Sequence, residues 1–375
     1  MRAPRRSSVP GCVESAHALP HAPFRVRRAL GSDALTLFDE RWDELVARQT
    51  VPTPTLSGLW LRELVRREPG TPLAIGVEAD GRLVAAGAFA VRRPFGRAGG
   101  VRIATWLARA FSSLSPDILV DPEFPEAGDL ILAGALDVAH ALHLGASPAG
   151  GQFANSMGRV APWGHAQHQE SGWMVALPPP RAERVRKNVL YYQRRADRLG
   201  ARVSVETRVS PDEVDAALAR LFALYEDRWR SRSGTSPWFH TEEQRAWYRR
   251  AVGQMAEAGS VRIVEVFEND YVVATVLGLL AGRGAGFHTT ATRLGGRLKS
   301  PGHLALLTWT DIARDEGATT MVLGRGAGNQ EGPKRKLGAI EVPFATFLVA
   351  RSEPLQRLLE RALRVRRTLS GLRLG

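Results

Sequence analysis

A chain of 375 residues with 44% hydrophobic and 24% charged residues is typical of folded globular proteins, and its length favours two domains. The formal net charge of +13 indicates anionic partners, namely nucleic acid, anionic lipid or phosphate-bearing ligands, although an arginine-rich coding bias explains the bulk charge equally well. The single cysteine, Cys12, excludes an intramolecular disulfide, and no Cys/His spacing indicates a metal site.

The two ends of the chain differ in composition from its middle. Residues 1–23 are rich in Pro, Ser and Arg without apolar periodicity, which predicts a disordered tail and not a secretory signal. No apolar run reaches the ~18 residues that cross a membrane, so we expect a cytoplasmic protein. Residues 351–375 alternate leucines with arginines at helical spacing, which predicts a basic amphipathic helix. Such a helix docks either on its own domain or on an anionic membrane.

Residues 24–176 combine helical and strand patterns, which predicts an N-terminal α/β domain. Asp80-Gly81 between two apolar runs is a strong signal for a β-hairpin. The spacing of the other apolar residues predicts the remaining elements. In chain order these are a strand over 24–27, helices over 33–49 and 57–67, the hairpin over 72–91, and strands over 101–107 and 117–120.

The prolines at 178–180 mark the start of a second domain, expected over 177–350, because they continue neither a helix nor a central strand. A basic helix over 181–200 follows, in which seven Arg or Lys residues outnumber two acids. The next elements are a strand over 202–209, helices over 211–232 and 241–258, a hairpin over 261–280, a strand over 286–291, a helix over 301–316, and strands over 319–323 and 341–350. The order helix, helix, hairpin, strand occurs in both domains, which indicates two copies of one α/β module.

The motif Ser300-Pro301-Gly302 follows a strand and opens a helix. The first amides of such a helix have no intrahelical acceptor, so those of Gly302, His303 and Leu304 are expected to bind phosphate or carboxylate with help from the helix dipole. The preceding loop adds cationic groups through Arg293, Arg297 and Lys299. An ordinary capped helix beside a polar loop is the alternative interpretation.

A second motif runs from Gly324 to Gly338 and combines several glycines with three consecutive bases. The glycines allow the backbone to approach a ligand closely, and the bases Lys334, Arg335 and Lys336 are expected to neutralise its charge. Glu331 is the carboxylate of this loop, and it fits a general base, an orienting partner for Lys334, or a solvated loop acid.

Four segments of the sequence together resemble a known family. They are Val185-Arg186-Lys187-Asn188 in the basic helix, the helical stretch 221–229, Ser300-Pro301-Gly302, and Gly324-Arg325-Gly326 with the ending 334–338. These segments resemble the FemAB/BioF2-like acyltransferases of the GNAT superfamily, the group that includes the cellulose-biosynthesis protein CelD. The resemblance covers about residues 181–345, and it is weaker over 24–175.

The resemblance implies an α/β (α+β) fold of tandem GNAT-like domains, each a mixed twisted sheet flanked by helices. The donor is then acetyl-CoA or another acyl-CoA that enters where the half-sheets splay apart. Its pyrophosphate is expected on the amides before the central helix, where Arg293, Ser300, Gly302 and His303 stand. The sequence 293–297 is only a loose echo of the superfamily's Q/RxxGxG/A loop. FemAB-type relatives use aminoacyl-tRNA as the donor instead.

Acyl transfer of this kind needs a deprotonated amine beside an activated carbonyl, with a donor for the oxyanion. The candidates for catalysis are His288 and Glu331 as bases and Tyr225 as a proton donor. The alternative role of His288 is that of a hydrogen-bonded strand residue. The alternative role of Trp238 is packing in a lid or in the core. The side chains expected to bind substrate are Arg228, Trp238, Arg325, Lys334, Arg335 and Lys336.

The sequence therefore predicts an acyltransferase acting on an amine, such as a cell-envelope or polysaccharide precursor or a small amino compound, without a metal. One alternative is a tRNA-dependent aminoacyl transferase that modifies a peptidoglycan precursor. A non-catalytic anion-binding protein with a degenerate GNAT fold is the other.

Overall fold

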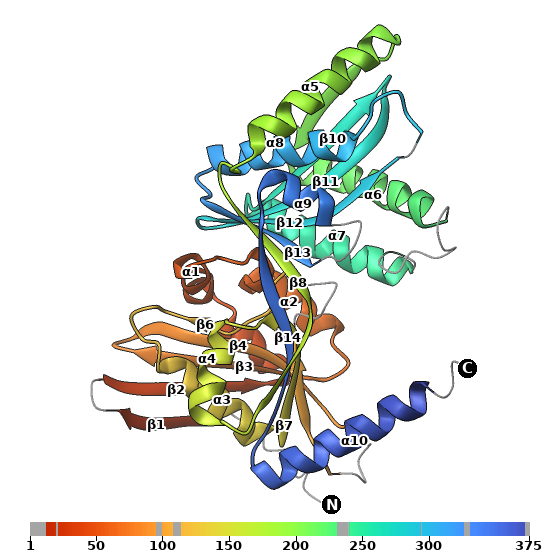
Figure 1. The fold of residues 1–375 in the computed structure, drawn as a ribbon. Helices are drawn as coiled ribbons and strands as arrows, with labels where there is room; N and C mark the ends of the chain where they lie inside the picture. Colours follow the sequence, from red (N-terminus) through yellow and green to blue (C-terminus); the bar gives the residue numbers. More distant parts are fainter. Residues whose placement is uncertain are drawn as a thin grey trace, which may run out of the picture.

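The strands of the described residues form one mixed sheet that passes through two lobes (Figure 1). The computed structural model describes residues 13–19, 22–94, 100–107, 114–230, 239, 241–293, 295–325 and 331–371. Within them the strand order is β1-β2-β3-β4-β5-β7-β14-β8-β13-β12-β11-β10-β9, with β6 beside β4. The predicted mixed α/β fold is confirmed.

The first half of the chain builds the lower lobe of Figure 1. Its elements are β1 (Val13–Leu19), β2 (Ala22–Leu30), the 3-10 helix η1 (Gly31–Leu37), α1 (Glu40–Arg48), the 3-10 helix η2 (Pro54–Leu56), α2 (Gly58–Arg67), β3 (Thr71–Ala79), β4 (Arg82–Arg92), β5 (Ile103–Trp106), β6 (Leu119–Val120), α3 (Ala127–Val138), β7 (Ala141–Pro148), α4 (Gln152–Val160) and β8 (His165–Ala176).

The second half builds the upper lobe and then returns to the lower one (Figure 1). Its elements are α5 (Ala182–Arg198), β9 (Val203–Arg208), α6 (Pro211–Arg230), α7 (Glu242–Glu257), β10 (Val261–Glu268), β11 (Tyr271–Ala281), β12 (Gly284–Thr292), α8 (Pro301–Asp315), β13 (Thr320–Arg325), α9 (Glu331–Leu337), β14 (Ile340–Ala350) and α10 (Glu353–Gly371). Among the described residues, no helix combines the length and apolarity needed to cross a bilayer.

Local signals explain where several helices begin and where the hairpins turn. The side chains of Asp39, Ser57 and Thr241 each accept a hydrogen bond from an amide in the first turn of α1, α2 and α7. Both predicted hairpins are confirmed, and their turns contain left-handed residues at Asp80-Gly81 and Asn269-Asp270.

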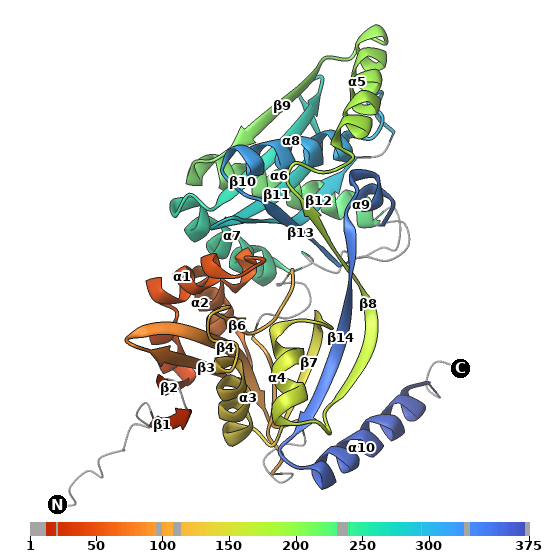
Figure 2. The ribbon, with the colours of Figure 1, turned by 60° about the vertical axis from the view of Figure 1, so that its left-hand side comes forward.

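Strands β8 and β14 tie the two halves together. The last strand, β14, lies between β7 of the first half and β8, while β8 pairs with β14 on one side and β13 on the other. Figure 2 shows the two strands running side by side from one lobe to the other. The expected boundary at residue 177 therefore does not divide the sheet into two independent sheets.

The N-terminal segment differs from the expected disordered tail. Residues 13–19 form β1 and pair antiparallel with β2, from Val13 opposite Arg28 to Leu19 opposite Ala22. An edge strand presents unpaired backbone groups, so it can recruit a segment whose composition alone does not predict a strand.

Side chains alternate between the two faces of the upper sheet. Ile263 belongs to a core with α6 and α7, whereas its neighbour Val264 belongs to a core with α5 and α8. The first of these cores also contains Trp42 of α1 and Trp60 of α2, and the rings of Trp60 and Trp247 lie 5.6 Å apart. The two lobes therefore share one hydrophobic core.

We predict that Gly278→Ala lowers the free energy of unfolding by about 1–3 kcal/mol, because a Cβ there would lie 2.4 Å from Cε2 of the buried Trp309 in α8. The control is Gly253→Ala in α7, where a Cβ would meet nothing within 4 Å. It should raise stability by ~0.5–1 kcal/mol, since alanine favours helix more than glycine does. Urea unfolding measures both, and equal stability of Gly278→Ala and wild type would contradict the packing of α8 on β11.

Candidate active site

The central strands of the upper sheet, β12 and β13, separate from one another. They pair in parallel only from Gly284 opposite Thr320 to Gly286 opposite Val322. Beyond this point β12 runs on to the start of α8, and β13 runs on towards α9. Gly324 has a left-handed backbone (φ 66°), and the pairing of β13 with β8 shifts register there, so β13 turns away from β12. The result is a wedge between the two strands.

A leucine from the first half of the chain lies against this wedge. A Cβ on Gly286 would lie 2.4 Å from Cδ1 of Leu114, and a Cβ on Gly324 would lie 3.3 Å from Cδ2 of the same side chain. The amide of Leu114 donates a hydrogen bond to Oγ1 of Thr55 at 3.1 Å. The lower lobe therefore fills one side of the wedge, and a ligand has room on the side of α8 and α9.

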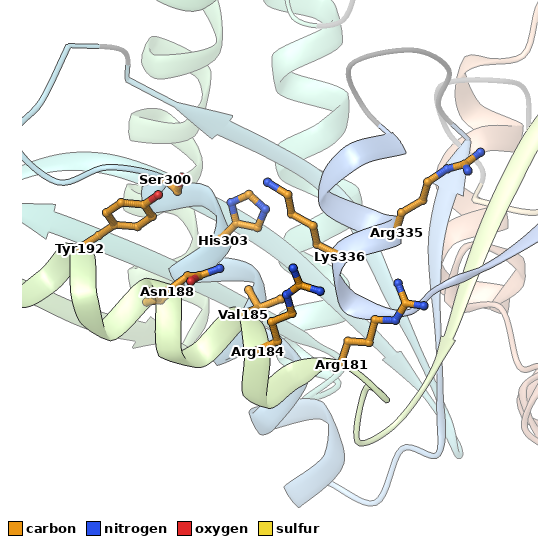
Figure 3. Close-up of a pocket in the computed structure, with 10 residues that line it drawn as sticks. Arg181, Arg184, Val185, Asn188, Tyr192, Ser300, His303, Arg335 and Lys336 are labelled. Atoms are coloured by element: carbon orange, nitrogen blue, oxygen red, sulfur yellow. The ribbon is translucent and has the colours of Figure 1, made fainter.

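A cavity of about 280 Å³ lies on that side, between α5, the start of α8 and α9 (Figure 3). Its lining residues are Arg181, Arg184, Val185, Asn188, Val189, Tyr192, Ser300, His303, Arg335 and Lys336. We call it the cationic cavity, because four of these side chains are basic and, within the described part of the chain, none is acidic. An anionic ligand suits this lining.

The start of α8 contributes backbone donors to the cationic cavity. Ser300 precedes the helix in a left-handed conformation (φ 57°), its side chain makes no capping bond, and Pro301 occupies the first turn. The amide of His303 donates to the carbonyl of Ser300 at 3.0 Å, which tightens the first turn. Since first-turn amides of a helix have no acceptor four residues earlier, this end attracts anions.

His303 adds a neutral imidazole to the same cavity. Burial and the nearby charge of Lys336 lower the pKa of His303 below its usual range. Its Nε2 atom is buried and makes no hydrogen bond within the described residues. A bound phosphate would satisfy this nitrogen and raise the pKa again, because an anion favours the protonated ring.

The loop before α8 is held by an internal carboxylate. Glu268 accepts hydrogen bonds from the amides of Arg297 at 3.0 Å and Leu298 at 2.8 Å. The expected cofactor residue Arg293 is exposed and is absent from the lining of the cationic cavity. Two loop amides therefore already have an acceptor, and anion binding falls to α5, α9 and the start of α8.

The three consecutive bases of α9 have different surroundings. Lys334 is buried, and its Nζ donates to the carbonyls of Gly324 at 3.2 Å and Arg325 at 2.8 Å. It fastens the end of β13 to α9, so we revise its expected role from ligand binding to positioning. Arg335 and Lys336 line the cationic cavity, with the guanidinium of Arg335 5.1 Å from the ring centre of Trp173.

His288 lies in a buried aromatic cluster on the face of the sheet covered by α6 and α7. Its Nδ1 is 2.5 Å from the hydroxyl of Tyr248, and its ring centre is 5.1 Å from that of Trp60. Burial lowers the pKa of His288 to about 3. Such a base is far too weak to be efficient near neutral pH. The geometry favours the alternative interpretation, a hydrogen-bonded strand residue.

Tyr225 belongs to the same cluster. It is buried, its ring centre lies 5.1 Å from that of Phe239, and it helps to raise the pKa of Tyr248, although burial is the main cause. Two of the expected catalytic residues, His288 and Tyr225, are thus near each other but on the opposite face of the sheet from the cationic cavity.

The remaining expected residues are scattered. Arg228 and Arg325 are half-buried at the ends of α6 and β13. Trp238 lies outside the described residues, as does the side chain of Glu331.

Sequence reasoning missed part of the cationic cavity. Arg181, Arg184, Asn188 and Tyr192 follow the spacing of one helix face, so the signal was present within the basic helix. Trp60 and Tyr248 had no such signal, because one comes from each half of the chain.

A second cavity, of about 220 Å³, lies between the two lobes, and we call it the interlobe cavity. It is lined by Asp117 with Gln49, Thr50, Val51, Thr53, Leu56, Ser115, Ile118, Leu119, Pro148, Gly150, Gly151 and Gln152, and by Trp173, Met174, Val322, Val342 and Phe344. Val322 is the last residue of β13 that pairs with β12, so the interlobe cavity reaches the base of the wedge.

Asp117 is the acidic residue of the interlobe cavity. Its carboxylate accepts hydrogen bonds of 2.8 Å from the amides of Ile118, Gln152 and Phe153, the last two at the start of α4. Burial raises the pKa of Asp117 to about 6, despite these bonds, which act in the opposite direction. At a pH above this value the carboxylate is ionised and can attract a cation.

Comparison with known proteins gives one match in sequence. Residues 183–331 match the family model of the acetyltransferase (GNAT) domain. This segment contains α5, the wedge and the start of α8, and the match indicates an acyltransferase domain in this part of the chain. No protein with a curated description matches the sequence significantly.

Solved structures share the fold over both lobes. FemX has a TM-score of 0.63 at 12% sequence identity, over 86% of this chain and 98% of its own. The C-terminal domain of a putative lysylphosphatidylglycerol synthetase from Agrobacterium fabrum has a TM-score of 0.54 at 13% identity, over 88% of this chain and 96% of its own. The GNAT part of the sequence resemblance is thus supported by the family match, and the two-lobed arrangement by the shared fold.

We predict that the neutral state of His288 makes stability fall as the pH decreases. The unfolded chain protonates this ring below the usual pKa of 6.5, whereas the folded chain resists protonation until about pH 3. Between pH 7 and pH 5, wild type should lose about 2 kcal/mol more unfolding free energy than His288→Gln, which retains a hydrogen-bonding group for Tyr248.

Urea unfolding at several pH values measures this difference. Asp117, whose raised pKa has the opposite effect, is present in both proteins and cancels. Parallel pH profiles for wild type and His288→Gln would show that His288 is not held neutral by the fold.

Proposed function

We propose that the protein is a GNAT-type acyltransferase that moves an acetyl or other acyl group from acyl-CoA to an amine acceptor. The acceptor class we propose is a cell-envelope or polysaccharide precursor or a small amino compound. The observation that carries the proposal is the cationic cavity, which joins the open start of α8 to basic side chains beside the wedge. Seven of its ten lining residues, from Arg184 to His303, lie within the matched acetyltransferase segment, which supports the same conclusion.

The charge of the donor suits the cationic cavity. Coenzyme A carries a pyrophosphate and a further phosphate, and the cavity offers Arg181, Arg184 and Lys336 together with the positive end of α8. The facing edges of β12 and β13 no longer pair with each other beyond Gly286 and Val322. Their backbone groups can hold the extended, amide-containing arm of the donor as an added strand.

The interlobe cavity provides a place for the acceptor. Asp117 attracts the ammonium form of an amine, and the surrounding aromatic and aliphatic side chains hold an apolar part of the same molecule. The bound ammonium first loses one proton to solvent. The amine nitrogen then attacks the thioester carbonyl, so that a carbon–nitrogen bond forms and the carbon–sulfur bond breaks, and the nitrogen gives up a second proton, which the leaving thiolate takes up. In this scheme the protein accelerates the reaction mainly by placing the two substrates on either side of the wedge.

A second candidate is transfer from an aminoacyl-tRNA, and the outward face of α5 favours it. This face carries Lys187, Arg194 and Arg198 beside Leu190 and Tyr191, which are 44% and 55% exposed. The cationic side chains are suited to the phosphates of a nucleic acid, and the exposed aromatic ring beside them is suited to stacking on its nucleobases.

We predict that the double variant Arg184→Gln, Lys336→Gln binds coenzyme A at least about tenfold more weakly. Two charged contacts are lost, and a loss of ~1.4 kcal/mol in binding free energy is enough for a tenfold change in affinity. Lys187→Gln with Arg194→Gln removes the same charge from the outward face of α5 and should leave the affinity unchanged. Titration calorimetry measures both.

The same proteins separate the two candidates. The tRNA-dependent reaction would be favoured if wild type retains tRNA but does not bind coenzyme A. Retention of tRNA should then fall steeply with salt and be lost in the Lys187→Gln, Arg194→Gln variant. Equal loss of coenzyme A affinity in both double variants would contradict the assignment of the cationic cavity.

A further inference from the structure

Among the side chains that the structure describes, those in the first turns of helix α10 fix it to the lower lobe. Leu359 is buried with Ala141, Leu348 and Ala350. The side chain of Gln356 is also buried, where it donates to the carbonyl of Leu348 at 3.1 Å and accepts from the amide of Ala350 at 2.8 Å. These contacts set the direction of the helix as it leaves β14.

The rest of the helix continues away from these anchors. Its 19 residues span about 28 Å, and Figures 1 and 2 show its C-terminal end projecting beyond the lower lobe. The segment Glu353–Gly371 contains five arginines and two glutamates, a net charge of +3. The helix is therefore long and strongly basic, and it extends well beyond its anchored first turns.

The outward face near the anchored end is apolar with cations beside it. Leu358 is 62% exposed, and Ala362, one turn further on, is exposed as well. Arg357 and Arg361 are exposed next to them at the same spacing. With Glu353 and Pro354, the side chains of Arg357, Leu358 and Arg361 surround a shallow hollow.

We propose that α10 docks the protein on the surface of an anionic lipid bilayer. Lipid phosphates complement the arginines, and the boundary of the acyl chains accepts Leu358 and Ala362. A second copy of this chain suits the face poorly, because it would bring arginines against arginines. The helix lies in the plane of the interface, since it is too polar to span a bilayer.

The test is sedimentation of the full chain with vesicles. Equal parts of phosphatidylglycerol and phosphatidylcholine form the anionic vesicles, and phosphatidylcholine alone forms the neutral ones. Wild type should sediment with the anionic vesicles only. The variant Arg357→Gln, Leu358→Ser, Arg361→Gln should partition about tenfold less or weaker still, because it loses two charges and the exposed apolar group.

A matched control removes the same groups from another exposed helix. Leu190→Ser with Arg194→Gln and Arg198→Gln on α5 should bind vesicles as wild type does. Thermal unfolding midpoints of both triple variants should equal that of wild type, since every changed side chain is exposed. If the unfolding midpoint of the α10 triple variant falls, the single variant Leu358→Ser, which changes one exposed side chain, takes its place in the vesicle experiment.

Three outcomes would overturn the proposal. The first is that wild type binds neutral and anionic vesicles equally, or binds neither. The second is that the α5 control loses binding while the α10 variant keeps it. The third is that light scattering finds a dimer of wild type that the α10 variant separates, which would assign the face to a second copy of the chain.

Discussion

The separation of β12 from β13 is the constraint on which the other features depend. Pairing stops at Gly286 and Val322, because Gly324 takes a left-handed conformation and Leu114 lies against both glycines. Lys334 holds this geometry from the other end by binding the carbonyls of Gly324 and Arg325. The wedge is thus maintained by the backbone of β13, a side chain of the lower lobe and a buried lysine of α9.

The arrangement places two cavities and one buried cluster on different sides of the upper sheet. The cationic cavity lies on the α5 and α8 face of the upper sheet, the interlobe cavity reaches the base of the wedge, and the cluster of His288 and Tyr248 lies on the α6 and α7 face. A donor and an acceptor bound in the two cavities would approach each other through the wedge. In the proposed function, the lower lobe therefore contributes to a site whose motifs lie in the second half of the chain.

The arginines of the chain have more than one role. Some arginines neutralise buried acids, as Arg208 and Arg220 do for the fully buried Glu265 at 3.1 and 2.6 Å. Others surround the cationic cavity, where the described lining contains no acid. Composition alone cannot separate these two groups, since the difference lies in which acids the fold brings near each arginine.

The sequence predicted the elements better than their assembly. Turn residues such as Asp80-Gly81 and the start of α8 are local signals, and the structure has a turn and a helix start at those positions. Three features depend on contacts between residues far apart in the chain, which spacing does not reveal. They are the pairing of β14 with β7 and β8, the position of Leu114 and the cluster around His288. Lys334 and Lys336 are neighbours in one motif, yet the turn of α9 directs one into the core and the other into the cavity. Hydrogen exchange with and without coenzyme A tests whether the donor binds in the cationic cavity. Exchange should slow at the start of α8 and along α5 and stay unchanged in α7, whereas unchanged exchange at α8 and α5 with saturating coenzyme A would contradict donor binding there.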